Sequence, residues 1–337
     1  MSQALALLAF FLVYDLVAPV LLLPQTHLET EEKAKKEGRV AYYTTMNITA
    51  ANLLIRSFEK KHPYIKVDLF RQGGEVLRTR VMTEAQAGRH YFDVASINVL
   101  DVQLLKKKGL LAPYVSAHRE GIPAGLRDKE GFWTGNFIIL YVVGYNTRMI
   151  TKGKIPPDWW NLLDPMWKGG KIGLDRDAVV WYAALRQKWG RDKSFEFFKK
   201  LSTQQPRYER GNTLRTQMMA AGEFVLAVVH AHKVEEFKSK GAPIDWVTTS
   251  NPIPAYGNVA GLSSNAPHPH AARLFLDYLF SKEGQLVVQE GGFISVRMDI
   301  PPPTPSLDQR KLVLYYVEPA LADYYNAYQK EYQELIQ

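Results

Sequence analysis

Short apolar strands alternate with amphipathic helices along the chain from Gly38 onward. Residues 40–43 form the first predicted strand, and the helix that follows it carries Leu54 and Phe58 on one face. Residues 65–70 and 92–96 begin two further strand–helix units. Strands separated by helices of this length form parallel βαβ units, so the pattern predicts an α/β fold with mixed, mainly parallel sheets.

The chain is too long for a single core. With 337 residues, 46% of them hydrophobic, it exceeds the length that one core usually fills, and two lobes are expected. The apolar stretch 137–145 is the predicted crossing strand between them. The predicted division is a leader or anchor plus linker at 1–37, lobe 1 from 38–134 and 250–300, and lobe 2 from 135–249 and 301–337.

An apolar run at residues 4–23 precedes the charged stretch 29–36. It matches the apolar region of an export signal, although the basic start and the cleavage site of such a signal are not clear. The run is also about long enough to cross a bilayer, so an uncleaved membrane anchor is the alternative. A buried core helix is less favoured, because the run is apolar on all sides. We expect an exported protein.

The formal charge of +8 favours an anionic ligand, an anionic surface or nucleic acid without choosing among them, and a generally basic surface explains it equally well. The longest lysine run, 106–108, ends a predicted helix, where cations suit the helix dipole, so nucleic acid is not expected as a partner. The chain has no cysteine, which excludes disulfides, thiolate metal sites and cysteine nucleophiles.

Residues 209–232 predict one side of a ligand crevice. A loop at 211–213 opens a helix, Gly222 ends it, and the apolar strand that follows leads into His230-Ala231-His232. Free N–H groups at a helix start, beside polar side chains at the end of a strand, are how open α/β sheets bind small ligands. The segment therefore predicts a small and negatively charged ligand.

Other candidate contacts stand at the predicted strand ends, where hydroxyl and N–H groups suit an oxyanion. Each of them is also explained as a helix cap. Arg176 either clamps a carboxylate or phosphate, or pairs locally with Asp175 and Asp177. The candidates are Thr44, Thr45, Asn47, Gly74, Glu75 and Ser96 on the first lobe, and Asp175, Arg176, Asn212, Thr213 and Tyr256 opposite them.

Three blocks of sequence resemble a known family: residues 163–169, the Gly222-Glu223 step into an apolar strand, and the helix 271–284 followed by Gly292-Phe293-Ile294. Similar blocks, in the same order over about 38–300, occur in the extracellular solute-binding proteins of bacterial ABC importers, in the branch that contains the ferric-ion-binding proteins. The resemblance implies a hinged, two-lobed type II periplasmic-binding fold. It also implies a mostly monomeric periplasmic protein that passes its ligand to a permease and its ATPase.

The chain departs from that branch at the end of the ligand strand. Ferric-binding members carry two adjacent tyrosines there, and this chain has His230-Ala231-His232. Residues two apart on a strand share a face, so the two imidazoles could chelate a metal ion, iron or another, or donate to an anion, or be structural. No third histidine is close in sequence, and we favour the anion over the metal. No other cofactor is expected.

An enzyme or a ligand-sensing protein on the same scaffold is the alternative function. The chain contains no Gly-x-Ser-x-Gly elbow, no His-Glu-x-x-His pair, no Walker Gly-Lys-Ser/Thr and no Gly-x-Gly-x-x-Gly loop. We therefore expect a binding protein and not an enzyme.

Overall fold

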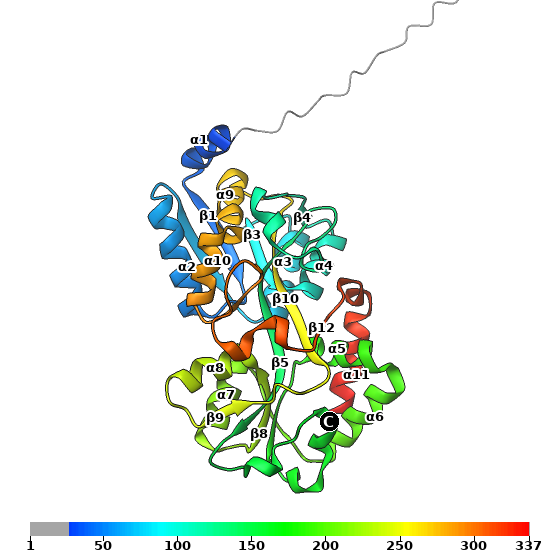
Figure 1. Cartoon of the computed structure of the whole chain (residues 1–337). Helices are drawn as coiled ribbons and strands as arrows, with labels where there is room; N and C mark the ends of the chain where they lie inside the picture. Colours follow the sequence, from blue (N-terminus) through cyan, green and yellow to red (C-terminus); the bar gives the residue numbers. More distant parts are fainter. Residues whose placement is uncertain (1–26, 337) are drawn as a thin grey trace, which may run out of the picture.

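The computed structural model describes residues 27–336, so the apolar run predicted to be a leader or anchor lies outside the described residues. Within residues 27–336, no helix is both long and apolar enough to cross a bilayer. Figure 1 shows two groups of helices, one around the upper part of the sheets and one around the lower part, with β5 and β10 running between them. The predicted two-lobed α/β fold is confirmed.

Two sheets share the long strand β5 (Thr134–Asn146). In the first sheet, β1 is parallel to both β2 and β3, while β10 is antiparallel to both β3 and β5. In the second sheet, β6 is parallel to β7 and β8, and β8 is antiparallel to β5. The first sheet contains β1 (Arg39–Thr44), β2 (Lys66–Arg71), β3 (Val94–Asn98), β4 (Leu111–Ala112), β10 (Ile253–Ser263), β11 (Ile294–Ser295) and β12 (Leu314–Tyr316), and the second contains β6 (Ile172–Asp175), β7 (Arg207–Glu209), β8 (Leu226–His230) and β9 (Ile244–Trp246).

Strand β5 changes partner halfway along its length. Its first half pairs with β10, where Ile139 lies opposite Tyr256, and its second half pairs with β8, where Tyr141 lies opposite His230. Twelve of its 13 residues are buried, which explains the unbroken apolar sequence. Because one continuous strand serves both sheets, Tyr141 stands where the two lobes meet.

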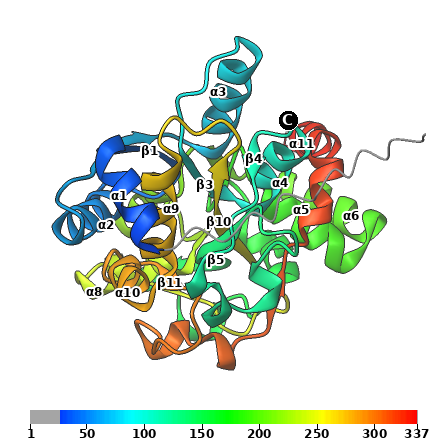
Figure 2. The same ribbon diagram turned by 90° about the horizontal axis from the view of Figure 1, so that it is seen from above.

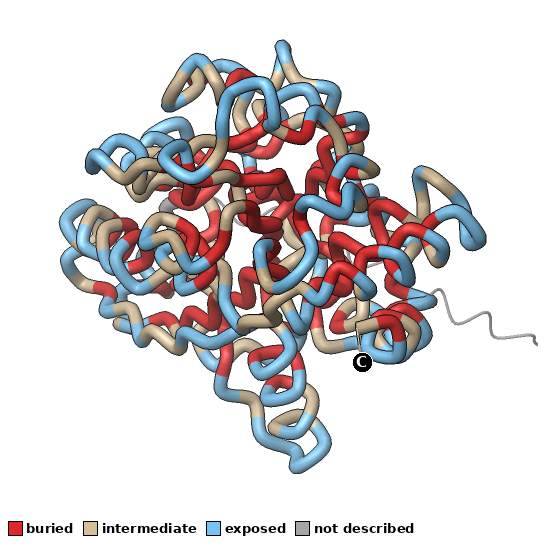
Figure 3. The backbone as a smooth tube through the Cα atoms, turned by 90° about the horizontal axis from the view of Figure 1, so that it is seen from below, coloured by how far each residue is buried: buried red, intermediate tan, exposed pale blue. Residues whose placement is uncertain are grey.

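The helices cover the faces of the two sheets, and the buried stretches, red in Figure 3, are enclosed by exposed ones. In the first lobe, the Phe275 ring packs 4.8 Å from Tyr42 and 5.0 Å from Phe58. The helices of the first lobe are α2 (Ile48–Lys61), α3 (Gly74–Gln86), α4 (Val99–Lys107), α9 (Pro269–Phe280) and α10 (Lys282–Glu290), and those of the second are α5 (Val179–Trp189), α6 (Arg191–Ser202), α7 (Asn212–Ala221), α8 (Ala231–Ser239) and α11 (Tyr325–Leu335).

The charged stretch predicted to be a linker is folded. Residues His27–Glu37 form helix α1, which lies against α9 (Figure 2). Ala34 is fully buried, and the Glu37 carboxylate accepts hydrogen bonds from the backbone N–H groups of His270 and Ala271. The sequence did not reveal this helix, because a helix with one small buried residue and charges elsewhere resembles a solvated segment.

The C-terminal segment touches both lobes. After β12 pairs with β10, the short helix η8 (Pro319–Tyr324) lies against α4, where Asp323 pairs with Lys107. Helix α11 then packs on α5 and α6, and its Glu331 accepts a 2.7 Å hydrogen bond from Arg186. The chain therefore passes between the lobes a third time, beside β5 and β10.

Candidate ligand-binding cleft

A cavity of about 350 Å³ lies between the two lobes, and we call it the inner cavity. Its size is typical of a site for a small solute. Both sheets contribute strand ends to it, and α11 supplies one wall. Its lining residues are Gly73, Gly74, Glu75, Val76, Asn98, Asp101, Tyr141, Asp175, Asp177, Val179, Val180, Arg210, Gly211, Tyr256, Tyr325 and Gln329.

Three helices begin at the inner cavity without a side-chain cap. The residues before α3, α5 and α7 are Gly73, Ala178 and Gly211, and none makes a side-chain capping hydrogen bond. Helices α2 and α4 differ, since Asn47 and Asn98 cap them. The first N–H groups of a helix have no partner within it and carry partial positive charge. Three such ends therefore face one cavity.

Two buried phenols also line the cavity. Tyr141 and Tyr256 are each 7% exposed, and their ring centroids lie 5.7 Å apart. Among the described residues, neither hydroxyl has a hydrogen-bond partner on a residue other than the second phenol. Burial raises the pKa of both hydroxyls, and the Asp175 carboxylate adds to the effect at Tyr141. Both groups stay protonated at neutral pH and can donate to a ligand.

Four carboxylates line the same cavity. Asp101 bonds Arg78 at 2.5 Å, Asp175 bonds Arg215 at 2.8 Å, and Asp177 lies 3.2 Å from Arg210. Burial raises the pKa of Asp101 and of Asp177, and the neighbouring arginines oppose that effect. The fourth, Glu75, accepts a hydrogen bond from the Gln329 amide.

The predicted contacts divide into three groups. Gly74, Glu75, Asp175 and Tyr256 line the inner cavity. Asn47 and Thr213 line a neighbouring space of about 780 Å³, which we call the outer cavity, together with Arg71, Lys233 and Lys240. The other predicted residues have local partners: Thr44 accepts from Met46 N–H, Asn212 accepts from His230 N–H, and the Arg176 Nε donates to the Tyr208 carbonyl at 3.4 Å.

The hydroxyl groups at the ends of β1 and β3 take part in a polar network within the first lobe. Asn258 donates to the Thr45 hydroxyl at 2.9 Å and accepts from the Ser96 hydroxyl at 2.5 Å. The Asn136 amide also donates to the Ser96 hydroxyl. Ser96 is fully buried, so this network stabilises the wall of the cleft. A ligand contact by Thr45 or Ser96 stays a prediction.

The two histidines do not lie on one strand, so that expectation was wrong. Strand β8 ends at His230, and His232 lies in the first turn of α8. The His230 ring packs 4.8 Å from Tyr141, and the His232 ring packs 4.8 Å from Phe293.

Burial keeps both imidazoles neutral. It lowers the pKa of His232 to about 3 and the pKa of His230 well below its usual range. Neither ring therefore carries a charge at neutral pH. Within residues 27–336, no group of three or more His, Cys, Asp or Glu side chains is arranged to hold a metal ion. Binding of a metal or an anion by His230 and His232 stays a prediction.

Sequence reasoning missed Tyr141, Tyr325 and Gln329. Tyr141 lies inside an apolar run that is typical of a buried core strand. The only feature that could have indicated a binding residue was its polar hydroxyl within that run. Tyr325 and Gln329 come from α11, far along the chain from the other lining residues. The Tyr325 ring lies 4.3 Å from the Arg78 guanidinium, so α11 meets the first lobe at the cavity wall.

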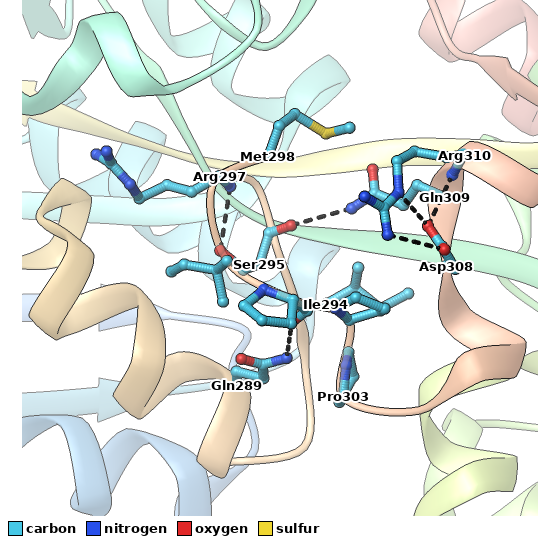
Figure 4. A pocket seen from close by; sticks show the side chains of 12 residues that line it. Gln289, Ile294, Ser295, Arg297, Met298, Pro303, Asp308, Gln309 and Arg310 are labelled. Atoms are coloured by element: carbon cyan, nitrogen blue, oxygen red, sulfur yellow. Dashed lines mark hydrogen bonds and ion pairs between the residues drawn. The ribbon is translucent and has the colours of Figure 1, made fainter.

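A third cavity, shown in Figure 4, is too small to hold a solute. Its volume is about 20 Å³, which suits a water molecule and no larger ligand. Gln309 donates to the Ser295 carbonyl across it, and Asp308 pairs with Arg310 at 2.8 Å.

The chain is similar to known bacterial proteins. Residues 99–315 match the family model described as bacterial extracellular solute-binding protein. An uncharacterized protein of Haemophilus influenzae is 27% identical over 282 residues, which covers 79% of each chain. Because the family model spans more than half of the chain, it establishes membership.

Solved structures show the same fold. Iron-bound HitA from Pseudomonas aeruginosa has a TM-score of 0.80 at 18% identity, over 88% of this chain and 99% of HitA. The periplasmic binding protein AfuA from Actinobacillus pleuropneumoniae, with fructose-6-phosphate bound, has a TM-score of 0.77 at 23% identity, over 89% of this chain and 96% of AfuA. The predicted type II periplasmic-binding architecture is confirmed. The chain belongs to the bacterial extracellular solute-binding proteins, the solute-capturing components of ABC importers.

Proposed function

We propose that the inner cavity captures a small solute by an oxyanionic group and that the protein delivers this solute to an ABC permease and its ATPase. The observation that carries the proposal is the convergence of three uncapped helix N-termini on one cavity with two protonated phenols. Each helix end contributes about 0.3–1 kcal/mol toward an anion, and each hydrogen bond to a charged group about 1.5–3 kcal/mol.

The proposed anion site spans the two lobes. Helix α3 belongs to the first lobe, while α5 and α7 belong to the second. A ligand that contacts both lobes binds the closed arrangement better than the open one, and it shifts the population toward closure by that difference in affinity. Capture and closure are then the same event, as delivery of an enclosed solute requires.

A metal ion is the second candidate ligand. HitA is iron-bound, and three phenols with carboxylates nearby are hard ligands in this cleft. Two features favour the anion. Burial raises the pKa of Tyr141, Tyr256 and Tyr325, so forming phenolates costs free energy, and two of the four lining carboxylates, Asp101 and Asp175, are already held by buried arginines.

We propose binding without catalysis, which the membership in a family of binding proteins supports. Export to the periplasm is supported by the same membership and by the apolar run at residues 4–23. Whether that run is cleaved or anchors the protein is tested by fractionating cells and measuring the mass of the mature chain.

The ligand proposal is tested by calorimetry on protein from which bound solute has been removed by unfolding and refolding. Inorganic phosphate, sulfate, a sugar phosphate and ferric citrate are the probes. Tyr256→Phe removes one donor and keeps the ring, so it should weaken anion binding about 5- to 30-fold, or about 1–2 kcal/mol.

The matched control is Tyr278→Phe, which removes a buried hydroxyl that bonds Ser57 in the first lobe and does not line the inner cavity. It should leave affinity unchanged. Equal affinity for anions in wild type and Tyr256→Phe, or tight binding of ferric ion that Tyr256→Phe abolishes while phosphate and the sugar phosphate do not bind, would contradict the anion proposal.

A further inference from the structure

We propose that the solute is a zwitterion, whose ammonium group sits between Glu75 and Asp177 while its oxyanion occupies the helix N-termini. The inference rests on the proposed function and adds the class of solute. Glu75 is in the first turn of α3, in the first lobe, and Asp177 precedes α5, in the second lobe. Both carboxylates line the inner cavity from opposite sides of the cleft.

These two carboxylates are the poorly neutralised ones among the four. Arg78 and Arg215, which hold Asp101 and Asp175, are 9% and 0% exposed, so those ion pairs are built into the protein. Among the described residues, Asp177 makes its ion pair with the Arg210 side chain, which is 76% exposed, and an exposed pair of this kind contributes about 0–1 kcal/mol. Glu75 makes no ion pair with a described residue; its partner is the neutral Gln329 amide.

A second observation points to a ligand beside the carboxylates. Tyr141 and Tyr256 are each 7% exposed and line the same cavity, and among the described residues neither hydroxyl has a hydrogen-bond partner other than the second phenol. Buried polar groups of this kind normally have a partner. A solute with both acceptor and donor groups satisfies the phenols, the helix ends and the carboxylates together.

Repulsion between the Glu75 and Asp177 carboxylates couples binding of the solute to closure of the lobes. Burial raises the pKa of Asp177, and the charges of Asp175 and Glu75 raise it further, so Glu75 acts on Asp177 across the cleft in this structure. Closing the lobes brings Glu75 and Asp177 nearer and removes water, which strengthens the repulsion. An ammonium group between the two carboxylates attracts both of them, so the net interaction across the cleft becomes favourable. This repulsion therefore favours the open arrangement in the empty protein, and a purely anionic solute does not remove the repulsion.

Arg210 is the competing explanation. Its side chain lines the inner cavity and also a neighbouring space lined by Glu75. Arg210 could therefore move between the two carboxylates on closure and take the place of a ligand cation. The experiment has to separate these two sources of positive charge.

The first experiment compares probes that differ by one ammonium group. Calorimetry on ligand-free protein measures 2-aminoethyl phosphate against ethyl phosphate, and ethanolamine alone. We expect the aminated phosphate to bind at least 10-fold more tightly in the wild type, and Glu75→Gln and Asp177→Asn each to bring the ratio close to one. Glu84→Gln, on the same helix but outside the inner cavity, should keep the wild-type ratio.

Several outcomes overturn the inference. A ratio near one in both the wild type and Arg210→Gln means that the site selects no cation. A ratio near one in the wild type that rises in Arg210→Gln assigns the positive charge between the carboxylates to Arg210. If ethanolamine alone binds as tightly as 2-aminoethyl phosphate, the phosphate group contributes nothing to affinity. That result would contradict the anion site and the proposed function.

The second experiment needs no ligand, so it decides the case in which none of the probes binds. Small-angle scattering on the empty protein measures how open the lobes are. We expect the double variant Glu75→Gln, Asp177→Asn to have a smaller radius of gyration than the wild type or Glu84→Gln, because the repulsion is gone. An unchanged radius overturns the coupling between these carboxylates and closure, whatever the anion site binds.

Discussion

At the residue scale, Arg215 holds the second-lobe side of the cleft together. It is fully buried, and its guanidinium donates to the Val228 carbonyl at 2.8 Å and to the Asp175 carboxylate at 2.8 Å. Val228 lies in β8 and Asp175 ends β6, so one side chain fixes the ends of two neighbouring strands. Arginine suits this position because its planar group donates in several directions.

Replacing Arg215 with Met should destabilise the protein by about 3 kcal/mol, because it leaves Asp175 without its countercharge and the Val228 carbonyl without a donor. Urea unfolding measures the free-energy change. Asp175→Asn in the same chain should recover about 1–2 kcal/mol, since the unpaired charge is removed as well. Strict additivity of the two substitutions would mean that the ion pair does not stabilise the fold.

His232 should make folding stability depend on pH. Its pKa is about 3 in the folded protein and near 6.5 when unfolded, so between these values the unfolded chain binds a proton that the folded chain refuses. The contribution of His232 is therefore complete above pH 6.5 and falls by up to about 1.4 kcal/mol per pH unit as the pH drops toward 3.

Unfolding in urea at pH 7 and pH 5 tests this dependence. His232→Gln should lose less stability between the two pH values than wild type does, by about 2 kcal/mol. His118→Gln, at an exposed histidine, is the control and should behave as wild type. An equal loss in all three proteins would show that His232 is accessible to protons in the folded state.

At the scale of elements, the strand–helix alternation was readable from sequence because period-2 and period-3.6 patterns report burial directly. The crossing strand was readable too, since a run buried on both faces has no polar period. Side-chain contacts across the cleft could not be predicted from the sequence. Ser96 stands at the predicted edge, yet its hydroxyl bonds Asn258 on the neighbouring strand β10, which is far away in the sequence. Tyr325 reaches the cavity only because α11 packs on α5.

Helix α1 stabilises the start of helix α9. The Glu37 carboxylate receives two N–H groups at the start of α9, and a negative acceptor at a helix N-terminus stabilises it. Glu37→Ala should lower the free energy of unfolding by about 1–2 kcal/mol, and Glu37→Gln by less because the amide oxygen still accepts. Glu32→Ala, whose side chain is 68% exposed on the same helix, should change it little, and an equal loss there would contradict the capping role.

At the scale of the whole molecule, three passages of the chain join the lobes: β5, β10 and the C-terminal segment. The first two lie side by side, with Ala255 opposite Leu140. The third contacts α4 through η8 and α5 through α11. We therefore expect motion between the lobes to be a rotation about the paired strands, in which α11 moves with the second lobe and carries Tyr325 and Gln329 with it.

The central claim is that a solute bound between the lobes closes them, and an inter-lobe distance tests it most directly. The chain has no cysteine, so Gln86→Cys on α3 and Lys199→Cys on α6 take spin labels at these two exposed sites alone. Pulsed electron–electron double resonance then measures the distance between the two labels in empty protein and after addition of the solute. The solute is the one that is retained by protein purified from its own host. The account predicts a shorter and narrower distance distribution with solute. The same distribution in both states would contradict capture by closure of the cleft.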